Sequence, residues 1–322
     1  MAIDSQRENK RIVIIEYIRI ISIFCVILFH LLGIMTGKEI IPNSNDLSIL
    51  RKISGHLVGI AVPFFLFISG YLYHKPSTKN KTSFILKKAK RLLLPYPIFT
   101  ILTMLASGYF DAIELYTGGF WHLWFLTSLF WCFVISVYID YSSKWIWILV
   151  PISLGLSLVR LPSFLGVQDF VVWYYYFVVG AIVKSHHINI RHKWIVSIVC
   201  ICAYIAVILI FPFHYRERSI IHAIAISALI YGIWILVKDL KLKLNRVVGL
   251  LGQCSMGIYI LHYIVLICLL SSISFRIFHI STLLQAYPMI TILGLSIIAY
   301  IVSFLSTMLL RTSKWTRVLI GG

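Results

Sequence analysis

The stretch IEYIRIISIFCVILFH (residues 15–30) decides the fold, because it is apolar like a membrane-spanning helix yet carries three ionisable side chains. A charged side chain in the centre of a bilayer costs roughly 2.5–3.5 kcal/mol on insertion scales. On a helix, Arg19 and His30 point to nearly the same side and lie roughly 16 Å apart along the axis. Glu16 precedes Arg19 by three residues, which is ion-pair spacing. The stretch therefore predicts a polar stripe along one face of an apolar helix.

The composition of the whole chain places this helix in a membrane protein. Of the 322 residues, 60% are hydrophobic and 12% are charged. A soluble domain of this length could not cover so much apolar surface. The 29 Lys and Arg outnumber the 11 Asp and Glu and give a net charge of +18. Because these charges fall between apolar runs, they favour a role in membrane orientation over nucleic-acid binding.

Apolar runs of about the length that a bilayer requires recur along the chain. We predict an all-α polytopic membrane protein with about ten transmembrane helices in a single domain, residues 1–322. If the N-terminus is cytoplasmic, 21 Lys and Arg fall in cytoplasmic segments and 7 in external ones. This bias follows the positive-inside rule and predicts that both termini are cytoplasmic. The predicted spans are residues 13–34, 57–73, 92–110, 121–139, 145–160, 171–185, 193–212, 220–237, 255–272 and 288–310.

The three ionisable residues of the first span allow two interpretations. In a structural one, Glu16 and Arg19 neutralise each other and His30 lies at the outer membrane interface. In a functional one, all three line an internal cavity, because ionisable residues in membranes usually face a bundle interior or water. Three such groups on one helix face favour the second interpretation.

Four later stretches, together with residues 15–30, resemble the sequence pattern of a known family. They are AVPFFLFISGYLY (61–73), KKAKRLLLPY (87–96), WHLWFLTSLF (121–130) and CSMGIYILHYIVL (254–266). In this order they resemble the acyltransferase 3 family of integral membrane acyltransferases, and most closely its short, single-domain members. The resemblance covers nearly the whole chain. It implies an enzyme of the bacterial cytoplasmic membrane that transfers an acyl group, most often acetyl from acetyl-CoA, to a sugar hydroxyl of a surface polysaccharide or its lipid-linked precursor.

The resemblance also implies that Arg19 and His30 are essential, with Glu16 where the family usually has aspartate. Acyl transfer to a hydroxyl needs a base and a group that stabilises the oxyanion. We predict His30 as the base, because histidine titrates near neutral pH. Arg19 lies too far from His30 along a straight helix to stabilise the oxyanion formed there. It is therefore predicted to bind the acyl donor. Direct transfer and relay through an acyl-histidine are both compatible with these residues.

A basic group at the start of the third predicted span is the predicted acetyl-CoA site. It contains Lys87, Lys88 and Arg91, and Arg91, the closest to the membrane, is the preferred ligand. Where this chain has Lys88 and Arg91 the family commonly has two arginines, and a lysine is a point charge rather than a bidentate fork. The group also fits an ordinary orientation signal. Several cations at one membrane edge would nevertheless attract the negative charges of coenzyme A.

His122, Trp124 and His262 are the predicted acceptor-binding residues. His122 and Trp124 also fit an aromatic belt at the membrane surface, and His262 also fits a hydrogen bond between helices. Gly70 and Gly257 are predicted to let helices approach closely. We expect membrane lipid and a surface glycan or lipid-linked saccharide as partners, and neither a metal nor nucleic acid.

A transporter or exporter is the alternative function. By the resemblance, the same kind of membrane domain accompanies a serine racemase, where it is thought to carry the amino acid, and some relatives are associated with exopolysaccharide succinylation or export. A Glu–Arg–His stripe would equally suit a proton- or substrate-conducting path. The sequence shows no racemase segment, which favours the enzyme.

Overall fold

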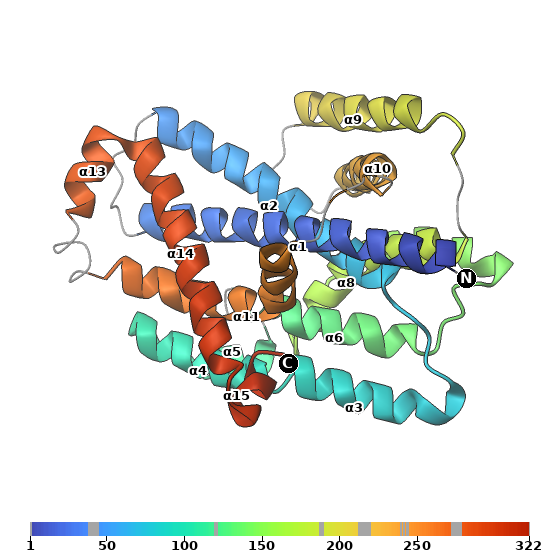
Figure 1. Ribbon diagram of the computed structural model, residues 1–322, viewed down its shortest axis with the longest axis horizontal. Helices are drawn as coiled ribbons and strands as arrows, with labels where there is room; N and C mark the ends of the chain where they lie inside the picture. The colour runs from blue at the N-terminus through green and yellow to red at the C-terminus, as the bar shows by residue number, and fades with distance from the viewer. Residues whose placement is uncertain are drawn as a thin grey trace.

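The computed structural model describes residues 2–37, 45–118, 122–186, 190–211, 220–238, 240, 242, 245–271 and 279–321; for residues 2–12, 36–37 and 45–48 the description covers the backbone only. Every regular element in these ranges is helical (Figure 1), which confirms the predicted all-α class. The helices are α1 (Ala2–Gly37), α2 (Asn45–Tyr71), α3 (Lys81–Leu92), α4 (Pro95–Ser107), α5 (Ile113–Thr117), α6 (Trp124–Ser136), α7 (Leu149–Leu156), α8 (Val167–Ser185), α9 (Lys193–Ile210), α10 (Ile220–Val237), α11 (Arg246–Leu269), α13 (Ile280–Ala286), α14 (Pro288–Leu310) and α15 (Lys314–Leu319), with 3₁₀ helices η1 (Thr78–Asn80) and η2 (Lys144–Ile148).

Each of the ten predicted spans falls on a helix, but the helices differ in length. Within the described ranges, seven helical segments are long and apolar enough to cross a membrane. The apolar helix α6 and the apolar segment formed by η2 and α7 are shorter than a span needs. The chain is thus a multi-pass membrane protein, while ten spans and cytoplasmic termini stay predictions. The seven segments are Val13–Met35, Ile49–Tyr71, Thr78–Ser107, Lys193–Ile210, Ile220–Val237, Arg246–Leu269 and Pro288–Leu310.

Helix α1 runs through the middle of the molecule (Figure 1) and contributes side chains to two apolar cores. The larger core is built mainly from α2, α6 and α8. The smaller one joins the second half of α1 to α11 and α14. Helix α9 lies at the edge against α10, and only 6% of its apolar window is buried. In a membrane the outer face of α9 would contact lipid, whereas the polar stripe of α1 lies where several helices meet.

Glycines set the closest helix contacts, as predicted for Gly70 and Gly257. A Cβ atom added at Gly70 would collide with the backbone of Phe177 on α8, and one at Gly257 would collide with Thr307 on α14. Small residues let backbones approach closely inside membranes. The prediction for both glycines is confirmed.

Candidate functional site

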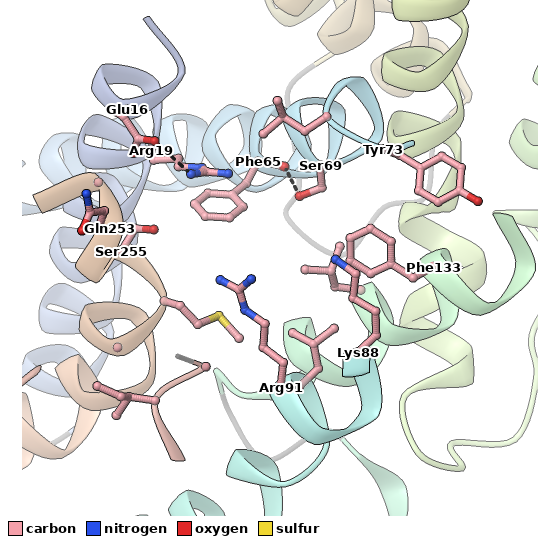
Figure 2. Close-up of a pocket in the computed structure, with 18 of the residues that line it drawn as sticks. Glu16, Arg19, Phe65, Ser69, Tyr73, Lys88, Arg91, Phe133, Gln253 and Ser255 are labelled. Carbon is pink, nitrogen blue, oxygen red and sulfur yellow. Dashed lines mark hydrogen bonds and ion pairs between the residues drawn. The ribbon is translucent and has the colours of Figure 1, made fainter. Parts of the chain in front are cut away.

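A cavity of about 610 Å³ lies among α1, α2, α3, α6 and α11, and the C-terminal residues Ile320 and Gly321 also line it. Its cationic lining residues are Arg19, Lys88, Arg91 and Arg311, and we call it the cationic cavity. Among the described residues that line it, Glu16 is the one carboxylate, so the lining has a formal charge of +3. Figure 2 shows Arg19, Lys88 and Arg91 entering the same space from α1 and α3.

The ion pair predicted in the first span is present. Arg19 Nη1 lies 3.3 Å from Glu16 Oε1, and both residues line the cationic cavity. Glu16 Oε2 and Arg19 Nε are buried without a hydrogen-bond partner in the described part of the chain. The Glu16 carboxylate packs on Gly252 of α11, where an added Cβ would collide with it. Pairing and cavity lining therefore occur together, and Gly252 provides the space for the pair.

Lys88 and Arg91 share one face of α3, since they are three residues apart. Lys88 Nζ lies 3.7 Å from the ring centroid of Phe133, a cation–π contact that fixes its direction. The positive charges of Arg91 and Arg19 repel each other, as do those of Lys88 and Arg91. Among the described residues neither Lys88 nor Arg91 has a carboxylate partner. The cavity therefore carries uncompensated positive charge that would attract an anion.

The predicted donor residues do not all reach the cavity. Lys88 and Arg91 line it, whereas Lys87 is exposed and does not. Arg311, which follows α14, was not singled out from the sequence because a cation after an apolar run fits the orientation signal. It lines the cavity and donates from Nη1 to Cys254 Sγ at 3.3 Å.

His30, His122 and His262 come together as a second group, which we call the histidine cluster. The ring centroids lie 5.4 Å apart for His30 and His262, 6.1 Å for His30 and His122, and 5.0 Å for His122 and His262. The three residues belong to α1, to the turn before α6, and to α11. Tyr263 stacks on His122 with a centroid distance of 4.9 Å. The structure thus places the predicted base beside two predicted acceptor-binding residues.

Backbone carbonyls hold two of these rings. His122 Nε2 lies 3.2 Å from the Ile260 carbonyl oxygen, and His262 Nδ1 lies 2.5 Å from that of Tyr259. A carbonyl oxygen only accepts, so each of these nitrogens carries the hydrogen. The other ring nitrogens, His122 Nδ1 and His262 Nε2, are buried without a partner in the described residues. In the same part of the chain no three His, Cys, Asp or Glu side chains are arranged to hold a metal ion.

An aromatic chain joins the cationic cavity to the histidine cluster. Phe65 lines the cavity and contacts Phe125, with ring centroids 5.5 Å apart. Phe125 contacts Tyr259 at 5.4 Å, and Tyr259 lies 5.7 Å from His262. Three successive aromatic rings, those of Phe65, Phe125 and Tyr259, therefore lie between the cavity and His262.

Trp124 follows His122 by two residues but packs in another direction. Its ring stacks on Trp173 of α8, with centroids 5.5 Å apart and planes at 25°. Its side chain is partly exposed, so part of its aromatic surface is accessible.

The fold and site define a multi-pass membrane protein in which one helix connects an anion-attracting cavity to a group of histidines. A family model described as an acyltransferase domain matches residues 12–310, nearly the whole chain. The chain therefore belongs to the acyltransferase 3 family, and this family implies acyltransferase activity. No curated protein and no solved structure matches the chain.

Proposed function

We propose that the protein transfers an acyl group, most simply acetyl from acetyl-CoA, to a sugar hydroxyl of a surface polysaccharide or its lipid-linked precursor in a bacterial cytoplasmic membrane. One observation carries the proposal: the same face of α1 provides Glu16 and Arg19 to the cationic cavity and His30 to the histidine cluster. A donor with an anionic head and a long neutral arm would suit such a pair of sites.

The cationic cavity would hold the head of coenzyme A. Its volume of about 610 Å³ is within the range of small-molecule sites. Arg91 and Arg19 can bind phosphate oxygens with two parallel hydrogen bonds, whereas Lys88 would act as a point charge. Glu16 would hold Arg19 in place. Lys87 would contribute only to the general positive potential, because it lies outside the cavity.

His30 would act as the base. The acceptor oxygen attacks the thioester carbon, the new C–O bond forms, and the C–S bond breaks. The hydroxyl proton passes to His30 and then to the departing thiolate, which leaves as the coenzyme A thiol. His122 and Trp124 would contact the sugar from the side of α6, and His262 would complete the site from α11.

Acyl transfer by the purified protein tests this proposal. The protein in lipid nanodiscs would receive radiolabelled acetyl-CoA together with lipid-linked saccharides, and His30→Ala would serve as the matched control. We expect labelled saccharide with the wild-type protein and none with the variant. The absence of transfer from acetyl-CoA and from succinyl-CoA, under conditions where the protein binds them, would contradict the proposal.

Transport is the second candidate, because charged groups on an internal helix face would also suit a conducting path. Membrane vesicles separate the two functions. Uptake or export of a solute that depends on His30 and needs no acyl donor would favour the transporter. Transfer that requires the donor would favour the enzyme.

A further inference from the structure

The histidine cluster contains two neighbouring rings, those of His30 and His262, with nitrogen atoms that have no hydrogen-bond partner among the described residues. His262 is fully buried, and its Nδ1 is occupied by the Tyr259 carbonyl. Its Nε2 is therefore unprotonated in the neutral ring, and it is buried without a partner. His30 is partly exposed and makes no hydrogen bond with the other described residues.

The distance from the His30 ring to the His262 ring fits a hydrogen bond better than the distance from the His30 ring to the His122 ring. Two imidazoles joined by an N–H···N bond have ring centroids roughly 5 Å apart, given a nitrogen separation of about 3 Å and the two ring radii. The centroids of His30 and His262 are 5.4 Å apart, whereas those of His30 and His122 are 6.1 Å apart. A small rotation of the partly exposed His30 ring would complete the bond to His262.

We infer that His262 is a positioning residue for His30: its bare Nε2 accepts a hydrogen bond from one ring nitrogen of His30. The other nitrogen of His30 is then unprotonated and available to the acceptor hydroxyl. The order of groups is the Tyr259 carbonyl, His262, His30 and the acceptor. A fixed tautomer matters for a base. In the wrong tautomer, the ring nitrogen that faces the acceptor hydroxyl already carries a hydrogen and cannot take the hydroxyl proton. This inference rests on the proposed function only for the role of His30 as the base.

Two substitutions of His262 test the roles of its two ring nitrogens separately. His262→Asn keeps an amide N–H near the position of Nδ1, where it can donate to the Tyr259 carbonyl, but lacks a group at Nε2. His262→Gln places its amide oxygen near the position of Nε2 and restores an acceptor for His30. His122→Gln is the matched control, since it keeps a donor for the Ile260 carbonyl and removes only Nδ1.

The ¹⁵N spectrum of the His30 ring in histidine-labelled protein in nanodiscs tests the inference without any substrate. In the wild-type protein we expect one neutral tautomer of His30 and a coupling across the N–H···N bond to His262. His262→Asn should mix the tautomers and lower acyl transfer about 100-fold with unchanged donor affinity. His262→Gln should restore the single tautomer and most of the rate, and His122→Gln should leave the tautomer unchanged.

Mixed tautomers of His30 in the wild-type protein would overturn the inference, and this measurement needs no variant to fold. So would a His262→Asn protein with the wild-type spectrum and rate. Failure of the proposed function has a different signature: His30 would keep its single tautomer, but no acyl group would reach a saccharide.

Discussion

The cationic cavity and the histidine cluster lie on the same face of α1, yet they are built by different means. In the cavity, charged side chains at helical spacing, Glu16 with Arg19 and Lys88 with Arg91, leave an excess of positive charge. In the cluster, three rings from distant segments come together, and backbone carbonyls hold two of them. Long-range attraction of an anion needs only net charge nearby. Proton transfer needs a defined nitrogen at a defined place, which requires packing.

The strongest way to break this comparison is to remove the base. His30→Ala should lower acyl transfer by about 10²–10⁴-fold, the usual contribution of a general base. Binding of coenzyme A should stay at the wild-type level, because His30 does not line the cationic cavity. Radiolabel transfer measures the expected loss of activity, and a separate coenzyme A titration measures the unchanged binding. A variant that transfers at the normal rate would show that His30 is not the base.

Removing a cavity cation should produce the opposite pattern. Arg91→Ala should weaken coenzyme A binding by about 10–100-fold, the value of a hydrogen bond to a charged group. At saturating donor the transfer rate should change little. Lys88→Ala and Lys87→Ala form a matched pair on α3, and the first should weaken binding far more, since Lys87 lies outside the cavity. Equal effects of the two lysines would mean that general charge, rather than the cavity, attracts the donor.

The close contact between Gly252 and Glu16 predicts a smaller effect, on the stability of the protein, that concerns the cationic cavity alone. Gly252→Ala should destabilise the protein by about 1–3 kcal/mol, because the new Cβ displaces the Glu16 carboxylate and the ion pair. Gly33→Ala on α1 is the control, since its Cβ meets nothing within 4 Å, and it should stabilise the helix by about 0.5–1 kcal/mol. Thermal unfolding in nanodiscs measures both. A Gly252→Ala protein as stable as the wild type would refute the close contact.

A change in salt concentration should have the smallest effect of these tests, and it should affect only the cationic cavity. Raising the ionic strength from about 0.1 M to 1 M shortens the Debye length from about 10 Å to 3 Å. Coenzyme A binding should weaken a few-fold, while transfer at saturating donor should be unchanged, because the histidine cluster contains no Lys, Arg, Asp or Glu side chain. Titrations and initial rates in the two salts measure these changes. A rate that falls with salt at saturating donor would place charge in the chemical step.

Local signals in the sequence predicted a part of the charged site but not all of it. The three-residue spacing predicted the ion pair of Glu16 and Arg19, which is present, and apolar runs predicted helices at the right places. Local spacing could not show that Lys87 is excluded from the cavity, because that depends on which face of α3 meets the other helices. Arg311 was missed because its neighbours in the cavity are far from it in the chain.

The histidine cluster could not be derived from spacing. His122 and His262 each had an adequate structural explanation alone, and only the packing of α1 and α11 around the turn before α6 brings them to His30. The lengths of α6 and α7 also depend on context. Helix α6 is mostly buried by other helices, whereas half of the residues of the equally apolar α7 are exposed, so hydropathy alone does not define how often these segments cross the membrane.

A structure of the protein with a non-hydrolysable acetyl-CoA analogue would test most directly whether α1 connects a donor site to a base. We expect the phosphates against Lys88 and Arg91 and the acyl carbon within reach of His30. Phosphates bound outside the cationic cavity, or an acyl end directed away from His30, would contradict this.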